Sequence, residues 1–213
     1  MEVILLKEVF IATQNLNKVK EILKIWGNVP FTVITVKDLP PLPPCNEVGN
    51  SYKENALYKA RWGAKNTGLY SVADDSGLEV EALDGKPGIY SARFGGDGLS
   101  YPQKIAHLLS LLKDVEQGKR KARFVCTAVL VTPEGELLKL TTGICEGEIA
   151  FAPQGKGGFG FDPVFFLPDL GKTMAQLSSR TKNKLSHRGK AFRELKNWIN
   201  HFLLKGTQKE SKK

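Results

Sequence analysis

The stretch VFIATQNLNKVKEILKIW, residues 9–26, changes within a few residues from an apolar run to a helical pattern. Val9–Ala12 is short and apolar and is followed by polar residues, which predicts a buried strand. Asn15 or Asn17 can cap the helix that follows, because their side chains accept hydrogen bonds from free backbone N–H groups. One face of this helix is expected to be buried, formed by Val19, Ile22, Leu23 and Trp26.

Further strands follow from the distribution of β-branched and apolar residues. Residues 121–131 and 136–146 predict two long strands, and Thr132-Pro133-Glu134-Gly135 between them predicts a hairpin turn. Shorter apolar runs predict three more strands, at residues 31–36, 71–73 and 164–166.

Three more helices are predicted from their start signals. Ser51 and Glu54 have the spacing of a capping box and open a helix that ends before Gly68. Pro102 lies in the first turn of the next helix, and Ser186 starts a terminal one. The terminal helix is expected to bury Phe192, Leu195, Trp198, Ile199 and Phe202. This mixture predicts an α/β fold with a mixed sheet, in two lobes around a cleft.

The composition bears on the compartment. Of 213 residues, 41% are hydrophobic and 25% are charged, as is usual for a globular domain. No apolar run approaches the roughly 20 residues that span a bilayer, and the first residues lack a signal-peptide pattern. Cys45, Cys126 and Cys145 are scattered, which favours free thiols and argues against structural zinc. We expect a cytoplasmic protein without a membrane partner.

The net charge of +9 is the strongest bulk signal. The tail, residues 206–213, is lysine-rich and is expected to be disordered; counted from Lys205, it contributes +3, which leaves +6 for the body. Such a surplus suits an anionic partner, either nucleic acid or a phosphorylated small molecule. A solvated lysine-rich surface would give the same charge.

The polar turn Thr13–Lys18 joins the first predicted strand to a helix N-terminus. Free N–H groups and the helix dipole favour an anion there, and Lys18 adds a positive charge. Simple helix capping is the alternative. The turn is not a Walker A loop, because GxxxxGK[ST] does not occur in the chain.

Asp74-Asp75-Ser76-Gly77 is expected at the end of a strand. Paired carboxylates suggest Mg²⁺, but neighbouring strand residues point to opposite faces, so only one of the two is expected to face a site. Glu47, which precedes the capping box, is a candidate second ligand. A turn formed by the DDSG residues is the alternative.

Gly155–Gly160 matches GxGxxG, but we reject a dinucleotide site because Asp162-Pro163 prevents a helix from starting there. A loop that presents Phe159 for stacking on a base, with Asp162 nearby, is the preferred interpretation; a plain hairpin connection is the alternative. Near the C-terminus, Lys182 and His187-Arg188 are candidates to bind a base edge or a phosphate. A purely structural histidine is the alternative for His187.

Seven segments, in this order and spacing, resemble the inosine triphosphate pyrophosphatase family. They are IATQNLNKVKEI, SYKENALYKA, ADDSGLEVEALDGKPGIYSARF, ARF at 122–124, GGFGFDPVFF, GKTMAQL and SHRGKAF. The resemblance runs from about Phe10 to Phe202 and implies one two-lobed domain over residues 1–205. It implies an elongated mixed sheet flanked by helices, a nucleotide-binding cleft between the lobes, and a homodimer.

The resemblance also implies the reaction, which is hydrolysis of a nucleoside triphosphate to monophosphate and pyrophosphate with Mg²⁺. Asp75 matches the proton acceptor and, with Glu47, the metal ligands. Phe161 stands where tyrosine is common, so the ring is kept and a hydroxyl is lost. The positions that match substrate-binding residues are Thr13, Gln14, Asn15, Leu16, Asn17, Lys18, Lys59, Ser76, Phe159, Gly160, Phe161, Asp162, Lys182, His187 and Arg188.

Two other functions compete with this one. A septum-formation-inhibitor-type nucleotide pyrophosphatase shares the general fold, but SHR and GGFGFDP favour the inosine type. A basic nucleic-acid-binding protein would explain the charge, yet the sequence has neither a known binding motif nor a basic stripe with aromatics. The expected partner is therefore a small nucleotide rather than nucleic acid, and the expected role is removal of inosine- and xanthosine-type triphosphates from the nucleotide pool.

Overall fold

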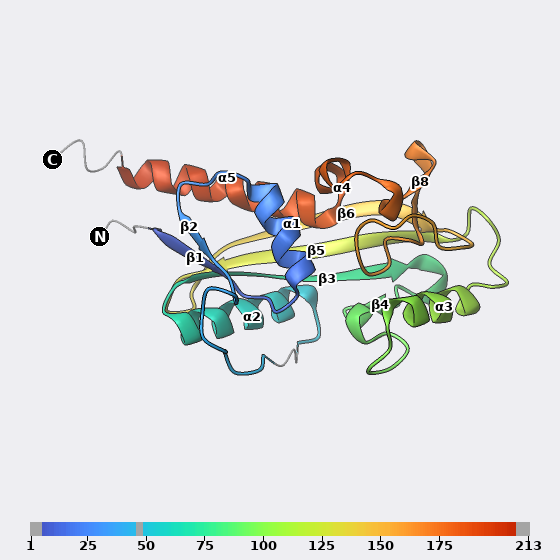
Figure 1. The fold of residues 1–213 in the computed structure, drawn as a ribbon, viewed down its shortest axis with the longest axis horizontal. Coiled ribbons are helices and arrows are strands. Elements are labelled where there is room, and N and C mark those ends of the chain that lie inside the picture. Colours follow the sequence, from blue (N-terminus) through green and yellow to red (C-terminus); the bar gives the residue numbers. More distant parts are fainter. Residues whose placement is uncertain (1–5, 46–48, 208–213) are drawn as a thin grey trace. The chain divides into compact units, whose positions relative to one another are not determined.

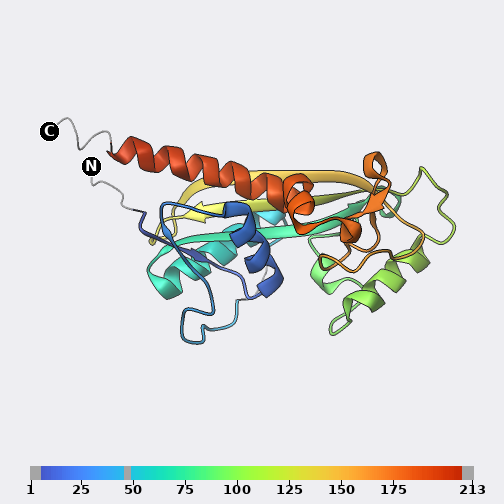
Figure 2. The same cartoon turned by 45° about the horizontal axis from the view of Figure 1, so that its top comes forward.

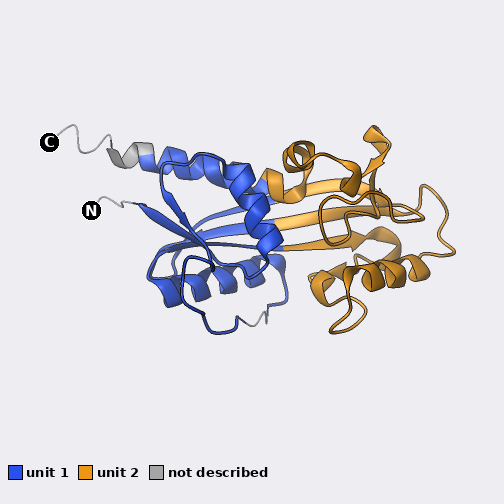
Figure 3. Ribbon diagram, viewed as in Figure 1, with its two compact units in different colours: residues 1–75, 127–142, 191–213 blue, residues 76–126, 143–190 orange. Residues whose placement is uncertain are grey.

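The computed structural model describes residues 6–45 and 49–207. The chain divides into two compact units, coloured separately in Figure 3: residues 1–75, 127–142 and 191–213 form unit 1, and residues 76–126 and 143–190 form unit 2. A single two-lobed domain with a cleft stays a prediction. From residue 208 onward, the predicted basic tail lies outside the described residues.

Eight strands of the described ranges form a mixed sheet in the order β2-β1-β3-β5-β6-β7-β8, with β4 paired to β3. β1 is parallel to β2 and β3, whereas β4 pairs antiparallel with β3, and β7 pairs antiparallel with β6 and β8. The strands are β1 (Glu8–Ile11), β2 (Thr32–Ile34), β3 (Tyr70–Val80), β4 (Pro87–Gly88), β5 (Lys121–Val131), β6 (Leu137–Ile149), β7 (Phe165–Leu167) and β8 (Lys172–Thr173). The predicted mixed α/β class is confirmed.

The helices flank this sheet (Figure 1). They are α1 (Leu16–Trp26), α2 (Tyr52–Thr67), α3 (Tyr101–Leu111), α4 (Ser179–Leu185) and α5 (His187–Thr207). The sequence predicted four of them, and α4 was missed because a seven-residue helix offers too little periodicity. Within residues 6–45 and 49–207, no helix is both long and apolar enough to cross a bilayer.

In unit 1, helices pack on both sides of the strands. α2 and α5 lie on opposite sides of the unit 1 strands in Figures 1 and 2. Ala56 and Ala60 of α2 pack in one cluster with Phe10 of β1. On the α5 side, Trp26 contacts the rings of Phe31 and Phe192 edge-on, and its Nε1 donates to the Phe192 carbonyl at 3.2 Å. These two small cores fix α1, α2 and α5 on the sheet.

Three predictions about unit 1 side chains need correction. Leu23 of α1 is 41% exposed, because the buried stripe runs along Val19, Ile22 and Trp26 and leaves Leu23 at its margin. Trp198 and Phe202 of α5 are only half-buried and stack on each other, with ring centroids 4.9 Å apart.

The capping box at the start of α2 is half formed. Ser51 Oγ accepts from the Glu54 N–H at 3.1 Å, as predicted. The Glu54 carboxylate instead accepts from the Asn50 N–H at 2.7 Å, so it ties the preceding loop to the helix.

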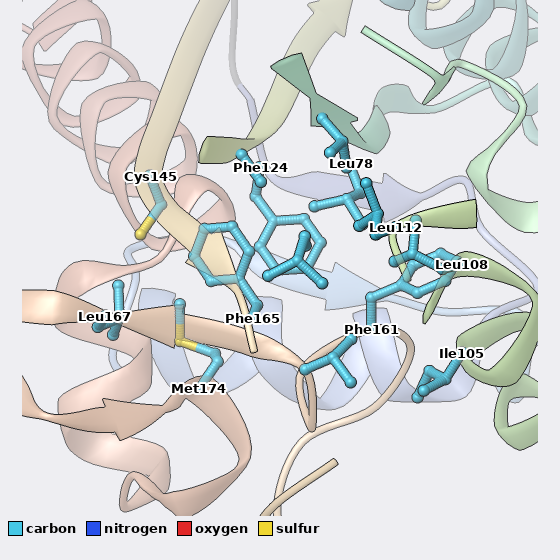
Figure 4. Close-up of a cluster of buried hydrophobic side chains, with 14 residues drawn as sticks. Leu78, Ile105, Leu108, Leu112, Phe124, Cys145, Phe161, Phe165, Leu167 and Met174 are labelled. Atoms are coloured by element: carbon cyan, nitrogen blue, oxygen red, sulfur yellow. The ribbon is translucent and has the colours of Figure 1, made fainter. Parts of the chain in front are cut away.

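Unit 2 has its own hydrophobic core (Figure 4). The rings of Phe124 and Phe165 meet with centroids 4.3 Å apart, and Leu108 of α3 is fully buried in the same cluster. Phe161, a predicted substrate-binding residue, also belongs to this core and is 3% exposed. Its ring packs edge-on against Phe94 and Tyr101, so the ring has a structural role in this core. A contact between this ring and the substrate stays a prediction.

Arg120 is a buried cation held by backbone carbonyls. It is 2% exposed, and its guanidinium donates to the carbonyls of Leu112, Val115, Ile149 and Ala150 at 2.6, 3.2, 2.8 and 3.3 Å. Burial lowers the pKa of Arg120, but a guanidinium stays charged at neutral pH. Since Leu112 is the C-cap of α3, the cation also sits where the helix dipole favours it.

Candidate active site

The polar turn Thr13–Lys18 links β1 to α1 in unit 1, as predicted. Asn15 is the N-cap, and its Oδ1 accepts from the N–H groups of Asn17 and Lys18 at 3.0 and 3.3 Å. Thr13 Oγ1 accepts from the Asn15 N–H at 3.2 Å. The capping interpretation is therefore confirmed for Asn15, and an anion at the same N–H groups would have to share them with this side chain. Gln14, Asn15, Leu16 and Asn17 are exposed.

Asp74 and Asp75 lie in the middle of the eleven-residue strand β3, not at its end. The DDSG turn is wrong, because the residues that follow extend β3 as Leu78 and Glu79 pair with β4. The two carboxylates meet different partners, as expected for neighbours on a strand. Lys18 Nζ lies 3.0 Å from Asp74 Oδ2, and Lys59 Nζ lies 3.0 Å from Asp75 Oδ1.

The Asp75 carboxylate is buried and receives donors from α2. Besides Lys59, the amide of Asn55 donates from Nδ2 to Asp75 Oδ2 at 3.2 Å. Asp75 is 5% exposed, Lys59 7% and Asn55 0%. Burying these charges is costly unless they are paired and hydrogen-bonded, and here both oxygens accept a hydrogen bond. Unit 1 thus gathers two lysines and two carboxylates at the start of α1, on α2 and on β3.

This donor set fits a magnesium ion that arrives with phosphates. In the described ranges, no three His, Cys, Asp or Glu residues cluster as a metal cage would require. Mg²⁺ in nucleotide enzymes is usually held by one or two carboxylates, with phosphate oxygens and water completing the octahedron. Asp75 offers such a carboxylate; Glu47, the other predicted ligand, lies outside the described residues.

In unit 2, an aromatic ring and two cations come together from three segments. Lys182 Nζ of α4 lies 4.8 Å from the centroid of the Phe159 ring, and Arg188 Cζ of α5 lies 5.5 Å from it. Asp162 fixes this arrangement, because one of its oxygens accepts from the Phe159 N–H at 2.7 Å and from Lys182 Nζ at 2.5 Å. Lys182 and Asp162 are almost fully buried, so the ion pair is held away from water.

The glycine-rich loop before Phe159 starts no α-helix, which confirms the expectation that none begins there. Gly158 has a φ of +71°, and a Cβ at this position would lie 1.9 Å from Asp162 Oδ2. Glycine is therefore needed for the loop to close over the Asp162 carboxylate.

The start of α5 carries the predicted histidine and arginine. His187 is 5% exposed and stacks on Phe124, with centroids 4.7 Å apart and an interplanar angle of 21°. Arg188 is 3% exposed and donates from Nη2 to Ser76 Oγ at 3.2 Å. Unit 2 thus brings Ser76, Phe159, Asp162, Lys182 and Arg188 into one connected group, and His187 packs in the core next to it.

Tyr101 belongs to the same group but was not predicted. Its ring lies next to Gly160, since a Cβ there would come within 3.5 Å of the Tyr101 ring. Burial raises the pKa of Tyr101; the Arg188 charge lowers it in part and the Asp162 charge raises it further. In the sequence, Ser100-Tyr101-Pro102 indicates only a helix start, so no signal singled out this phenol.

Comparisons with known proteins find relatives of this chain whose similarity extends over both units. The sequence model of the Ham1 family matches residues 9–198. The dITP/XTP pyrophosphatase of Geobacter sulfurreducens is 46% identical over 189 residues, which cover 89% of this chain and 94% of that protein. The dITP/XTP pyrophosphatase of Dictyoglomus thermophilum is 44% identical over 197 residues, which cover 91% and 95%. A HAM1 protein from Coxiella burnetii has a solved structure with a TM-score of 0.82 at 36% identity, covering 92% of this chain and 99% of that one. This chain belongs to the Ham1 family.

Proposed function

We propose that this protein hydrolyses non-standard purine nucleoside triphosphates, of the inosine and xanthosine type, to the monophosphate and pyrophosphate. The names of the two relatives at 46% and 44% identity support the substrate class. The observation that carries the chemistry is the buried Asp75 carboxylate bound by Lys59, next to Asp74, which binds Lys18 of the polar turn. Such a set of charges suits phosphoryl chemistry, which depends on positioning and electrostatic stabilisation.

The unit 1 residues are assigned to the phosphates. Lys18 and Lys59 would each place an ammonium against phosphate oxygens, and Thr13–Asn17 would line the chain of phosphates. Asp75 would orient the attacking water and take its proton. Magnesium, held by Asp75 and Glu47, would neutralise phosphate charge and polarise the phosphorus when bound.

The unit 2 residues are assigned to the nucleoside. Phe159 would stack on the purine, and the Phe159–Asp162 loop would hold it through backbone groups. Lys182, His187 and Arg188 carry N–H donors, and arginine has no acceptor. A 6-oxo purine offers an acceptor to these donors, whereas the 6-amino group of adenine opposes donor to donor. Mismatch in a polar site can discriminate by about 10⁴ or more, which would spare ATP.

The proposal also covers the setting of the enzyme: a cytoplasmic homodimer that cleans the nucleotide pool and needs no nucleic acid. The net charge of +9 is then a phosphate-attracting field rather than a nucleic-acid footprint. DNA binding with a steep salt dependence would contradict this part, because phosphate contacts release counterions.

The reaction itself makes the first prediction. With inosine triphosphate and Mg²⁺, the purified protein should release pyrophosphate and inosine monophosphate, and chelation of the metal should abolish turnover. Ion-exchange chromatography of the products checks both points across all common and non-standard triphosphates. Release of phosphate and a diphosphate would show that the bond between the α and β phosphates is not the one cleaved.

A second prediction concerns base selection by Arg188. Replacing Arg188 with Ala should narrow the ratio of kcat/KM for inosine triphosphate over ATP by at least about tenfold, since a hydrogen bond to a charged group contributes about 1.5–3 kcal/mol. Phe159→Ala should lower both values by similar factors, because stacking does not distinguish the two rings. Arg188→Lys is the matched control: it keeps the charge but lacks the planar fork, so it should restore only part of the ratio. Equal losses for both substrates in Arg188→Ala would make this arginine a phosphate contact.

A further inference from the structure

We infer that Asn55 is a positioning residue for Asp75, and that it ties the backbone of the preceding loop to this carboxylate. Its side chain is fully buried and is used at both ends. Nδ2 donates to Asp75 Oδ2 at 3.2 Å, and Oδ1 accepts from the Gly49 N–H at 2.8 Å. The inference rests on the proposed role of Asp75.

The surroundings of Asn55 explain why an amide is needed there. Asn55 lies on the buried face of α2, which also carries Lys59 and small residues such as Ala56, Ala60 and Ala64. A buried polar side chain is tolerated only when its hydrogen bonds are made. Asparagine alone offers a donor and an acceptor at this length: aspartate would present only acceptors to Asp75, and leucine would present neither.

Asn55 and Lys59 act on Asp75 as a pair. They are four residues apart and therefore project from the same face of α2. Lys59 contacts Oδ1 and Asn55 contacts Oδ2, so the helix fixes the rotation of the carboxylate about its Cβ–Cγ bond. Without Asn55, the carboxylate could turn towards Lys59 and present both oxygens to the ammonium. That rotation would move the lone pairs assigned to the metal and the attacking water.

The loop side of the bridge is equally close. A Cβ on Gly49 would lie 2.7 Å from Glu54 Cβ and 2.8 Å from Asn55 Oδ1, so only glycine lets the backbone approach the first turn of α2. Two neighbouring side chains bind this backbone: Asn55 binds the N–H of Gly49, and Glu54 binds the N–H of Asn50. Of these two side chains, Asn55 also binds Asp75, so Glu54 serves as a matched control.

The test compares Asn55→Asp, Asn55→Ser and Glu54→Ala by pyrophosphate release from inosine triphosphate and by amide exchange of Gly49 and Asn50 in NMR. Asn55→Asp keeps the acceptor for Gly49 but sets an oxygen against Asp75. We expect its kcat to fall by at least about 30-fold with KM changed less than about threefold, because a displacement of 1 Å at a catalytic group can cost about 100-fold. The Gly49 amide should stay protected in this variant.

The other two variants separate the two ends of the bridge. Asn55→Ser leaves room for a water and is expected to fold. Its kcat should fall as in Asn55→Asp, and its Gly49 amide should also lose its protection from hydrogen exchange. Glu54→Ala should speed exchange at Asn50 while kcat stays within about twofold, since surface contacts of this kind contribute little.

The outcomes distinguish this inference from the proposed function. If Asn55→Asp and Asn55→Ser keep kcat within about twofold while Asp75→Asn is inactive, Asn55 is not a positioning residue and the proposed function stands. If Glu54→Ala loses as much kcat as the Asn55 variants, the loop and not the Asp75 contact matters, and the inference is again overturned. A wild-type kcat in Asp75→Asn would instead refute the proposed role of Asp75.

Discussion

Asp75→Asn is expected to lower kcat for inosine triphosphate by at least about 100-fold, in line with the loss of a general base. The substitution removes the negative charge that faces Lys59 and the proposed metal, while it changes the side-chain volume very little. An asparagine at this position also turns an N–H donor towards either Lys59 or Asn55, both of which are donors themselves. Steady-state pyrophosphate release gives kcat, and circular dichroism with a melting curve checks that the fold survives.

Asp74→Asn is the matched control for Asp75→Asn. Asp74 is the preceding residue of the same strand, and its carboxylate binds Lys18 instead of Lys59. Loss of that charge should weaken the hold on the Lys18 ammonium, which still donates to the Asp74 carbonyl at 3.4 Å, and should act mainly on KM. A near-normal kcat in Asp75→Asn together with a large loss in Asp74→Asn would move the proton acceptor to Asp74.

Of the substitutions proposed for this protein, Arg120→Leu should lower the free energy of unfolding the most. The substitution removes the guanidinium donors from the carbonyls of Leu112, Val115, Ile149 and Ala150. The Leu112 carbonyl keeps the Val115 N–H at 3.1 Å, so the loss falls on the other three. Each buried acceptor left without a partner costs about 1–3 kcal/mol, so we expect the free energy of unfolding to fall by about 3 kcal/mol or more. For a chain of this length, that corresponds to a drop in Tm of roughly 6–12 °C.

The measurement for Arg120 can exploit the placement of the tryptophans. The three tryptophans of the chain, Trp26, Trp62 and Trp198, belong to unit 1, whereas Arg120 belongs to unit 2. Tryptophan fluorescence and far-ultraviolet circular dichroism together show whether unit 2 melts first or both units melt together. Arg120→Lys, which keeps a charge but not the fork of donors, should lose less. If the Tm of Arg120→Leu decreases by less than about 2 °C, water has replaced the guanidinium as the donor to these carbonyls.

Much of the fold was predictable because local signals agreed with the final packing. Asn15, Ser51 and Pro102 mark helix starts in the sequence and mark them in the structure. The extent of β3 was not predictable, because Asp74 and Asp75 are poor strand formers. They remain in the strand because Lys18 and Lys59, far from them in sequence, bind their carboxylates.

The candidate site was predictable to a different degree in each unit. The polar turn could be found from residues alone, and Lys59 only through the family resemblance. Asn55 was missed, although a signal existed: a polar residue four positions before Lys59 on the alanine face of α2. Nothing in the sequence marks Tyr101, because its contacts with Gly160 and Phe161 join segments about 60 residues apart.

The division of the chain has a consequence for its synthesis. The chain passes between the units after residues 75, 126, 142 and 190, within β3, β5, β6 and α5. Unit 2 ends at residue 190, but unit 1 still lacks most of α5, including Phe192, which packs on Trp26. Domains usually fold from the N-terminus as the ribosome releases them. Here the unit that contains the first strand is completed after unit 2. Trp26 can therefore contact Phe31 early in synthesis, but it meets Phe192 only after all of unit 2 has been made.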